Sequence, residues 1–517
     1  MTAETPERDE IVVAKRPAPG QPRPYDFPSV QQQRLRNGLL VVLVDMPGRP
    51  LVSSTLVVPV GAADEPPEDA GAAVLAARAM TEGTEQYDAV ALTEAAERLG
   101  ASIHAESGWD ATSVGIDVPS ARLGPALELL AEVLLRPTFP ADEIERLRDE
   151  RLNDLLQAQA DPRRRADETF IGTIYAAESP YHRPAAGTRE TVERLGRDAA
   201  VRAYHRILDP DRATLVVAGE LRGQDVVSIA NSLFGAWTRH ADAAGRNAVV
   251  DAPSTSGRIV RVVHRPGSVQ TEIRIGHPGL PRRIPDYHAV SIMSAILGGL
   301  FNSRLNMQLR EEKGYTYGAG AGFDMRRAAG PFTARAAVNT EVTVPAVIDT
   351  LAELKKMRDT SVEARELSAA RDFLIGVFPL RFETPGAVVG AITGLAVHGL
   401  GIEELTDYRR RIEAVDVDAV AKAARDHLDV EKAAIVLVGD VDAFGGELEG
   451  AGLGRLVIDR DETPGPVLPE AEAKAAALAT DEEDESGPTA GAEEPTLPGS
   501  EGSEPGSLLN DEDQRPG

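Results

Sequence analysis

One pattern occurs twice in this chain, about 220 residues apart, and this repeat limits the possible fold more than any other feature. Leu215 to Gly219 and Ile435 to Gly439 are short apolar, β-branched runs, each ended by glycine and an acid. Such runs are typical of buried strands. A charged segment of helical character precedes each run, and strand-like alternation followed by a helix-like segment lies further upstream. The matching pairs are 190–206 with 406–428, 113–118 with 332–338, and 120–135 with 344–358.

This duplication predicts an α+β fold with two homologous domains, each a mainly antiparallel sheet with helices packed on one face. We expect the domains to span 35–238 and 258–455, joined by a linker at 239–257 that is rich in Ala, Asp, Gly, Ser and Pro. Residues 1–34 carry several prolines and mixed charge and are expected to form a disordered arm.

The end of the chain, residues 456–517, is predicted to be an acidic disordered tail. From Asp461 onward there are 16 acidic and two basic residues and no aromatic residue. Such a segment cannot bury enough apolar surface to order itself. It carries −14 of the net charge of −27, so the rest of the chain is negative as well.

A negative body argues against nucleic acid or an anionic membrane as a partner, because both attract basic surfaces. The first residues contain no apolar targeting segment, and no stretch approaches 18 consecutive apolar residues. We therefore expect a soluble, cytoplasmic protein. The chain has no cysteine and no two histidines three to five residues apart, so the sequence predicts no metal site.

The run from Ser303 to Tyr317 carries the most specific chemistry. Gly314 follows a helix-compatible segment and marks its end, which places Arg310 in the last turn and Tyr317 at the start of the next strand. A guanidinium can hold a peptide carbonyl or carboxylate, and a phenol can donate a hydrogen bond to a developing oxyanion. The structural alternative is that Arg310 pairs with a nearby glutamate while Tyr317 packs in the core.

This run resembles the SRL, LRExxG and Tyr signature of the insulinase and pitrilysin-like zinc metallopeptidases, found in the second of their homologous domains. The resemblance spans roughly residues 35 to 450. It implies that Arg310 and Tyr317 face the scissile peptide, and that paired domains form half of a clam-like chamber. Some bacterial members, and the subunits of mitochondrial processing peptidase, divide the zinc site and the Arg/Tyr pair between two polypeptides.

Residues 71–84 resemble the frame of the family's inverted zinc motif, H-x-x-E-H, but its chemical positions are replaced. The alignment places the two histidine ligands on Val74 and Arg78 and the general base on Ala77. The third ligand, a glutamate on a later helix, falls near Asp154. Catalytic zinc needs three protein ligands and an open position for water. We therefore expect no cofactor bound by this chain, and zinc in a partner subunit.

Residues 100–112 loosely match the family's strand whose edge pairs with substrate backbone, with His104 where Asn is usual. Backbone pairing needs no particular side chain, so His104, Ala105 and Glu106 form a possible substrate edge strand. An ordinary edge strand with a surface histidine is an equally good interpretation.

The leading hypothesis is a non-catalytic, substrate-binding subunit of a heterodimeric metallopeptidase, which supplies Arg310 and Tyr317 to a zinc-bearing homologous partner acting on peptides or unfolded proteins. The alternative is a peptide-binding scaffold or chaperone-like assembly subunit without hydrolytic role. An autonomous peptidase conflicts with Val74, Ala77 and Arg78.

Overall fold

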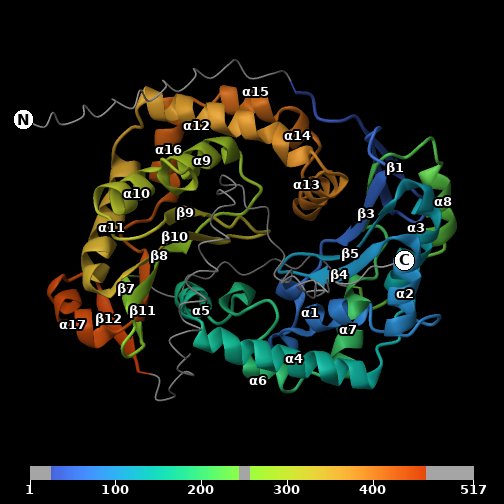
Figure 1. Cartoon of the computed structure of the whole chain (residues 1–517), viewed down its shortest axis with the longest axis horizontal. Helices are drawn as coiled ribbons and strands as arrows, with labels where there is room; N and C mark the ends of the chain where they lie inside the picture. Colours follow the sequence, from blue (N-terminus) through green and yellow to red (C-terminus); the bar gives the residue numbers. More distant parts are fainter. Residues whose placement is uncertain (1–24, 244–256, 461–517) are drawn as a thin grey trace, which may run out of the picture.

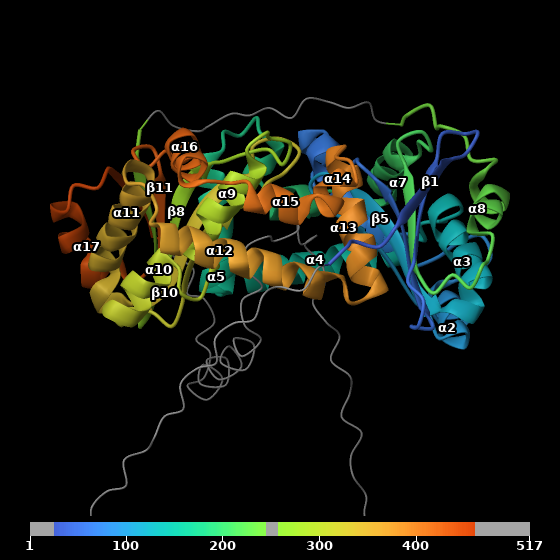
Figure 2. The ribbon, with the colours of Figure 1, turned by 90° about the horizontal axis from the view of Figure 1, so that it is seen from above.

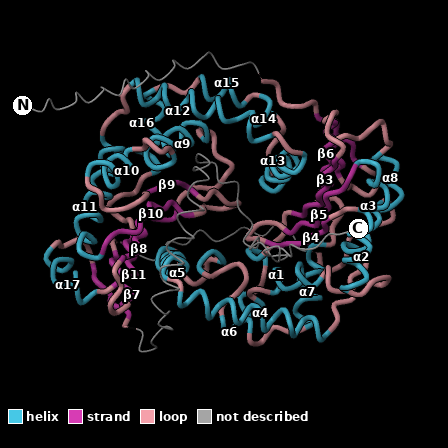
Figure 3. The backbone as a smooth tube through the Cα atoms, viewed as in Figure 1, coloured by secondary structure: helices cyan, strands magenta, loops and turns pink. Residues whose placement is uncertain are grey.

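The computed structural model describes residues 25–243 and 257–460. Two six-stranded sheets lie at opposite ends of the molecule, with helices around and between them (Figures 1 and 3). The predicted tail from residue 461 onward, the first 24 residues and most of the linker fall outside the described residues.

The first sheet has the strand order β1-β2-β6-β3-β5-β4. Only the β2–β6 pair is parallel, and the other four pairs are antiparallel. The strands are β1 (Val30–Arg34), β2 (Leu40–Asp45), β3 (Leu51–Val58), β4 (Ser102–Ser107), β5 (Thr112–Pro119) and β6 (Thr214–Gly219).

The second sheet has the order β12-β7-β11-β8-β10-β9. Here β7 pairs in parallel with both β12 and β11, and the remaining pairs are antiparallel. The strands are β7 (Ile259–His264), β8 (Gln270–Pro278), β9 (Ala319–Phe323), β10 (Pro331–Asn339), β11 (Ala434–Gly439) and β12 (Arg455–Asp459).

Helices make up most of the remaining described chain. The first half contains α1 (Ala72–Ala79), α2 (Ala89–Leu99), α3 (Leu123–Leu135), α4 (Ala141–Ala160), α5 (Pro162–Ile174), α6 (Arg189–Val192), α7 (Arg197–Ile207) and α8 (Val226–Phe234). The second half contains α9 (Tyr287–Ser294), α10 (Arg304–Asn306), α11 (Thr343–Asp359), α12 (Ala364–Val377), α13 (Pro385–His398), α14 (Glu403–Thr406), α15 (Tyr408–Glu413), α16 (Val417–His427) and α17 (Val441–Gly450). Two π-helical segments, η5 (Ala295–Gly299) and η6 (Met307–Glu312), flank α10. Short 3-10 turns are η1 (Ala62–Asp64), η2 (Pro67–Asp69), η3 (Ser120–Arg122), η4 (Pro180–His182), η7 (Thr340–Val342) and η8 (Phe378–Phe382).

The α+β class and the duplication predicted from the sequence are confirmed. Helices α7 and α16 begin and end 220 residues apart, and β6 and β11 occupy the same position in their sheets. Each charged segment expected as one helix is instead broken. In the first half the break lies at 193–196. In the second the segment is broken at Asp407 and again at 414–416, where the Asp416 side chain caps α16.

The ends of the two predicted domains differ from the structure. β1 belongs to the expected arm 1–34 and β12 to the expected tail 456–517, yet each forms the same edge of its sheet. Tyr25 and Phe27 also pack against Phe378 and Phe382 of the second half. Strand pairing therefore orders both segments, and aromatic contacts add to it at the first.

Each sheet is covered on one face by helices of its own half and on the other by one helix of the opposite half. Val42, Val44 and Val216 of the first sheet share a core with Val388 and Ile392 of α13. In return, α5 packs on β8 and β11, where Phe170 and Ile174 contact Val436. Figures 1 and 2 show α13 beside the first sheet and α5 beside the second. Each half thus contributes one helix to the sheet of the other half. The sequence periodicity within one half does not predict this packing.

A polar contact also joins the two halves. The guanidinium of Arg327 lies 3.1 Å from Asp64 Oδ1, and its backbone N–H donates to Asp110 at 2.6 Å. The hydroxyl of Tyr181 donates to the other Asp110 oxygen at 2.9 Å. Because both carboxylates are buried, they need this guanidinium as a partner.

No single helix of the described chain is long and apolar enough to span a membrane. The continuous segment from α12 to η8 and the helix α13, which meet at an angle of 113°, have the length and composition of a span only when taken together.

Candidate functional site

The predicted zinc-motif positions lie on α1 in the first half. Gly71 precedes this helix with a φ of 100°, a conformation that favours glycine. Ala77 is buried, Val74 is half-buried and Arg78 is exposed. None of these three side chains can ligate a metal in the way that the family motif requires.

Arg78 is held by carboxylates. Its Nη2 lies 2.8 Å from Glu150 Oε2 on α4. Arg146, one turn earlier on α4, contacts the same Glu150 and also Glu82 and Glu143, both at 2.6 Å. Burial raises the pKa of Glu82, and Arg146 opposes that shift. Two guanidinium groups and three carboxylates thus occupy the place where the motif implies a metal, so zinc does not fit here.

On α4, the residue that pairs with Arg78 is Glu150. Asp154 lies one turn further along α4 and pairs with Arg151 and with Arg164, the latter at 2.8 Å. The hydrogen bonds of these two arginines lower its pKa, although burial opposes them. Residues four apart share one helix face, so Glu150 and the predicted position Asp154 lie on the same side of α4.

A buried carboxylate controls the start of α1. Glu65 accepts hydrogen bonds from the backbone N–H of Gly71, at 3.0 Å, and of Ala73. Burial raises the pKa of Glu65 to about 8, while these two N–H groups and Arg183 act in the opposite direction. The role of Glu65 cannot be predicted from the sequence, because a lone glutamate before a helix carries no distinctive signal.

The Arg310 segment has unusual local geometry. Arg310 lies on the π-helical segment η6, and Gly314 follows it with a φ of 64°. Single π-helical turns are rare and occur frequently at functional sites. The predicted helix end at Gly314 is thus seen in the structure, but the segment is a π-helix rather than a regular α-helix.

The side chains of Arg310 and Tyr317 reach the surface. The Arg310 guanidinium lies 4.6 Å from the ring centre of Phe301, and its Nε lies 3.7 Å from Glu311. Tyr317 is 81% exposed, so the interpretation that it packs in the core is wrong. It also precedes β9 by two residues instead of starting that strand, because β9 begins at Ala319.

Buried polar contacts hold the segment that carries both residues. Asn306 accepts a hydrogen bond from the N–H of Ala319 at 2.8 Å and donates to Leu300 at 3.3 Å. Arg304 forms two hydrogen bonds with Glu366, each of 2.8 Å. Sequence reasoning missed Asn306 and Phe301, since neither residue type has a fixed role at such spacings.

The expected substrate strand lies at a sheet edge. β4, with His104, Ala105 and Glu106, is the last strand of the first sheet, and β9 is the last strand of the second. His104 is exposed and its ring lies against Gly115 on β5. Both edge strands lie on the sides of the sheets that face each other (Figure 1). Helices α1 and α10 lie in opposite halves, so the chain does not bring Arg310 to its own α1.

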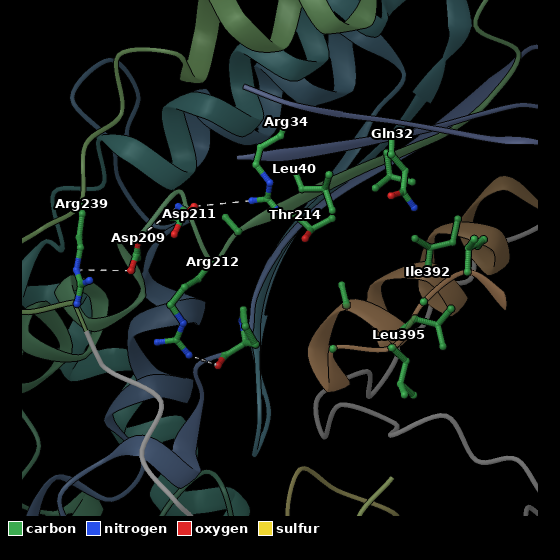
Figure 4. A pocket seen from close by; sticks show the side chains of 18 residues that line it. Gln32, Arg34, Leu40, Asp209, Asp211, Arg212, Thr214, Arg239, Ile392 and Leu395 are labelled. Carbon is green, nitrogen blue, oxygen red and sulfur yellow. Dashed lines mark hydrogen bonds and ion pairs between the residues drawn. The ribbon is translucent and has the colours of Figure 1, made fainter. Parts of the chain in front are cut away.

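A cavity of about 560 Å³ lies elsewhere, between the first sheet and α13 (Figure 4). Arg34 and Arg239 at its border pair with Asp211 and Asp209, at 3.8 and 3.5 Å. Ile392 and Leu395 line the other side. None of the residues predicted from the sequence lines this cavity.

Comparison with known proteins identifies the fold and the family. Residues 40–189 match the family model "Insulinase (Peptidase family M16)", and residues 194–374 match "Peptidase M16 inactive domain". A solved M16 inactive domain from Pseudomonas fluorescens aligns with a TM-score of 0.74 at 25% identity, over 80% of this chain and 98% of that one.

Relatives carry different descriptions. An uncharacterized zinc protease of Mycobacterium tuberculosis is 25% identical over 409 residues, which cover 78% of this chain and 92% of the relative. The Non-peptidase homolog YmxG of Helicobacter pylori is 20% identical over 371 residues, covering 71% and 84%. Together with the matched models and the replaced motif on α1, these likenesses show that the chain belongs to peptidase family M16, as a non-catalytic member.

Proposed function

We propose that this chain is the substrate-binding subunit of a heterodimeric M16 peptidase and supplies Arg310 and Tyr317 to a zinc-bearing homologous partner. The observation that carries the proposal is the 81% exposure of Tyr317, two residues before an edge strand and on the same segment as Arg310. A large aromatic side chain that contributes to folding is normally buried, whereas one that serves a ligand stays accessible.

The chemistry assigned to the pair follows from the side chains. Arg310 would bind a carbonyl or carboxylate of the peptide through the N–H donors of its planar guanidinium. The Phe301 ring stacks against this guanidinium. Tyr317 would donate a hydrogen bond to the oxygen on which charge develops. Hydrolysis would belong to the partner, whose zinc supplies the activated water.

The arrangement of this chain supports a role for a zinc-bearing partner. Arg78, Arg146 and Glu150 fill the motif on α1, and α10 lies in the other half of the molecule. Within the described residues β4 and β9 are the outermost strands of their sheets, where an extended peptide could add by backbone pairing, and this supports peptide or unfolded-protein substrates.

The test is reconstitution with the zinc-bearing homologue and cleavage of a quenched fluorogenic peptide library. Arg310→Ala and Tyr317→Phe should each lower turnover on the order of a hundredfold to a thousandfold, as loss of an oxyanion donor typically does. Gel filtration should show an unchanged complex. Tyr315→Phe is the matched control, since Tyr315 packs against the core beside the same glycine.

Wild-type turnover for both Arg310→Ala and Tyr317→Phe, in an intact complex, would reject the proposal. Peptide binding that persists in that case would favour the scaffold or chaperone-like role instead.

A further inference from the structure

Two histidines and an aspartate meet at the end of the first half, at a place unrelated to the zinc motif. His205 lies in the last turn of α7, and His240 and Asp242 follow α8. The imidazole rings are stacked, with centres 4.0 Å apart and planes at 18°. One ligand atom from each of the three residues lies within 4.8 Å of the others.

The backbone fixes this arrangement. The N–H of His240 donates to the carbonyl of Leu208 at 2.9 Å, so the loop is tied to the end of α7. Trp237, three residues earlier, is buried in the first core. Arg239 pairs with Asp209 at 3.5 Å, on the other side of the same connection. These contacts hold the two chain segments together, and the stacked rings need only turn for their in-plane nitrogen lone pairs to converge on one ion.

The local chemistry suits a cation. Neutral imidazole and carboxylate are ligands of zinc and of neighbouring divalent metals. The last carbonyls of α7 add partial negative charge. Arg239, a cation of the described part of this loop, is already paired with a carboxylate.

We propose that His205, His240 and Asp242 bind one divalent transition-metal ion, of which zinc is the simplest probe, where the chain leaves the first half. The ion would link the segment after α8 to the end of α7. Sequence spacing predicted no metal site, because the two histidines are far apart in the chain and only the fold brings them together.

A second group, His264 with Asp440 and Asp442, is a poorer candidate. The N–H of Val441 donates to His264 Nδ1 at 3.2 Å, that of Gly267 donates to Asp440 at 2.8 Å, and Arg460 pairs with Asp442 at 2.8 Å. In the first group, by contrast, His240 Nδ1 accepts a hydrogen bond from the N–H of Asp242 at 3.1 Å, and the other ring nitrogen of His240 would bind the metal ion.

The experiment uses the full chain without a histidine tag. Zinc titration by calorimetry should give one ion per chain, and cobalt should give the visible absorption of a nitrogen-ligated ion. His205→Ala and His240→Ala should each weaken zinc binding at least roughly tenfold, since even the loss of an outer partner of a metal ligand costs that much. Asp242→Asn, at an exposed side chain, tests the carboxylate without endangering the fold.

His104→Ala and His264→Ala are the controls, and both should bind zinc as the wild type does. Absence of zinc uptake by the wild type would overturn the proposal. Equal binding by Asp242→Asn, His205→Ala and the controls would also overturn it, because the ion would then sit elsewhere. The test needs no peptidase activity and is independent of the proposed partner.

Discussion

Replacing Glu65 by glutamine should change how stability depends on pH. The carboxyl is only 9% exposed and accepts two backbone N–H groups at the start of α1. Its pKa is raised from 4.5 to about 8, chiefly by burial. The native state therefore holds a proton that the unfolded chain has already lost between these two values.

The sign follows from proton linkage. A raised pKa in the native state gives stability that is fully present below the unfolded pKa and is lost as pH rises through the folded pKa. Each pKa unit corresponds to about 1.4 kcal/mol, so the contribution of Glu65 should fall by about 3 to 4 kcal/mol between pH 5 and pH 8. Glutamine cannot ionise, so Glu65→Gln should remove this part of the pH dependence.

The assay is urea unfolding of the wild type and of Glu65→Gln at several pH values between 5 and 8. The free-energy difference between the two should shift in favour of the variant as pH rises. Glu68→Gln, at an exposed glutamate of the adjacent turn, is the matched control and should run parallel to the wild type. A constant difference between wild type and Glu65→Gln across this range would refute the reasoning.

Three further outcomes are expected. The chain alone should cleave no peptide, with added zinc or with chelator, because Val74, Ala77 and Arg78 offer neither ligands nor a base; chelator-sensitive peptidase activity in the fluorogenic assay would contradict this. Arg327→Ala should lower the free energy of unfolding by roughly 3 to 5 kcal/mol, since it removes the cation from the buried carboxylates of Asp64 and Asp110, and Asp64→Asn in the same chain should recover part of it in urea titrations. Asn306→Ala should cost about 1 to 3 kcal/mol by leaving the Ala319 N–H without its acceptor, and hydrogen exchange at Ala319 should rise while exchange in β6 stays unchanged.

The sequence predicted the elements with regular patterns. The alternation before Pro119 and Asn339 appears as β5 and β10, and the helices that follow are α3 and α11. Strand and helix periods are local properties, so a single chain is enough to find them.

Features that depend on distant contacts could not be predicted in this way. Arg78 meets Glu150 only once α1 and α4 are packed together. Tyr317 looks like any core aromatic until its exposure is known. His205 and His240 carry no shared motif and meet only because the backbone of His240 bonds to Leu208.

The exchange of α5 and α13 has a consequence for synthesis. When the ribosome has completed β6, the face of Val42, Val44 and Val216 still lacks its cover, because α13 is encoded by residues 385–398. At usual elongation rates the missing helix emerges roughly ten to thirty seconds later. During that interval the nascent first half presents an apolar sheet face that a chaperone can bind. A fragment of residues 25–243 made alone should keep this face open and bind a hydrophobic dye, whereas the whole chain should not.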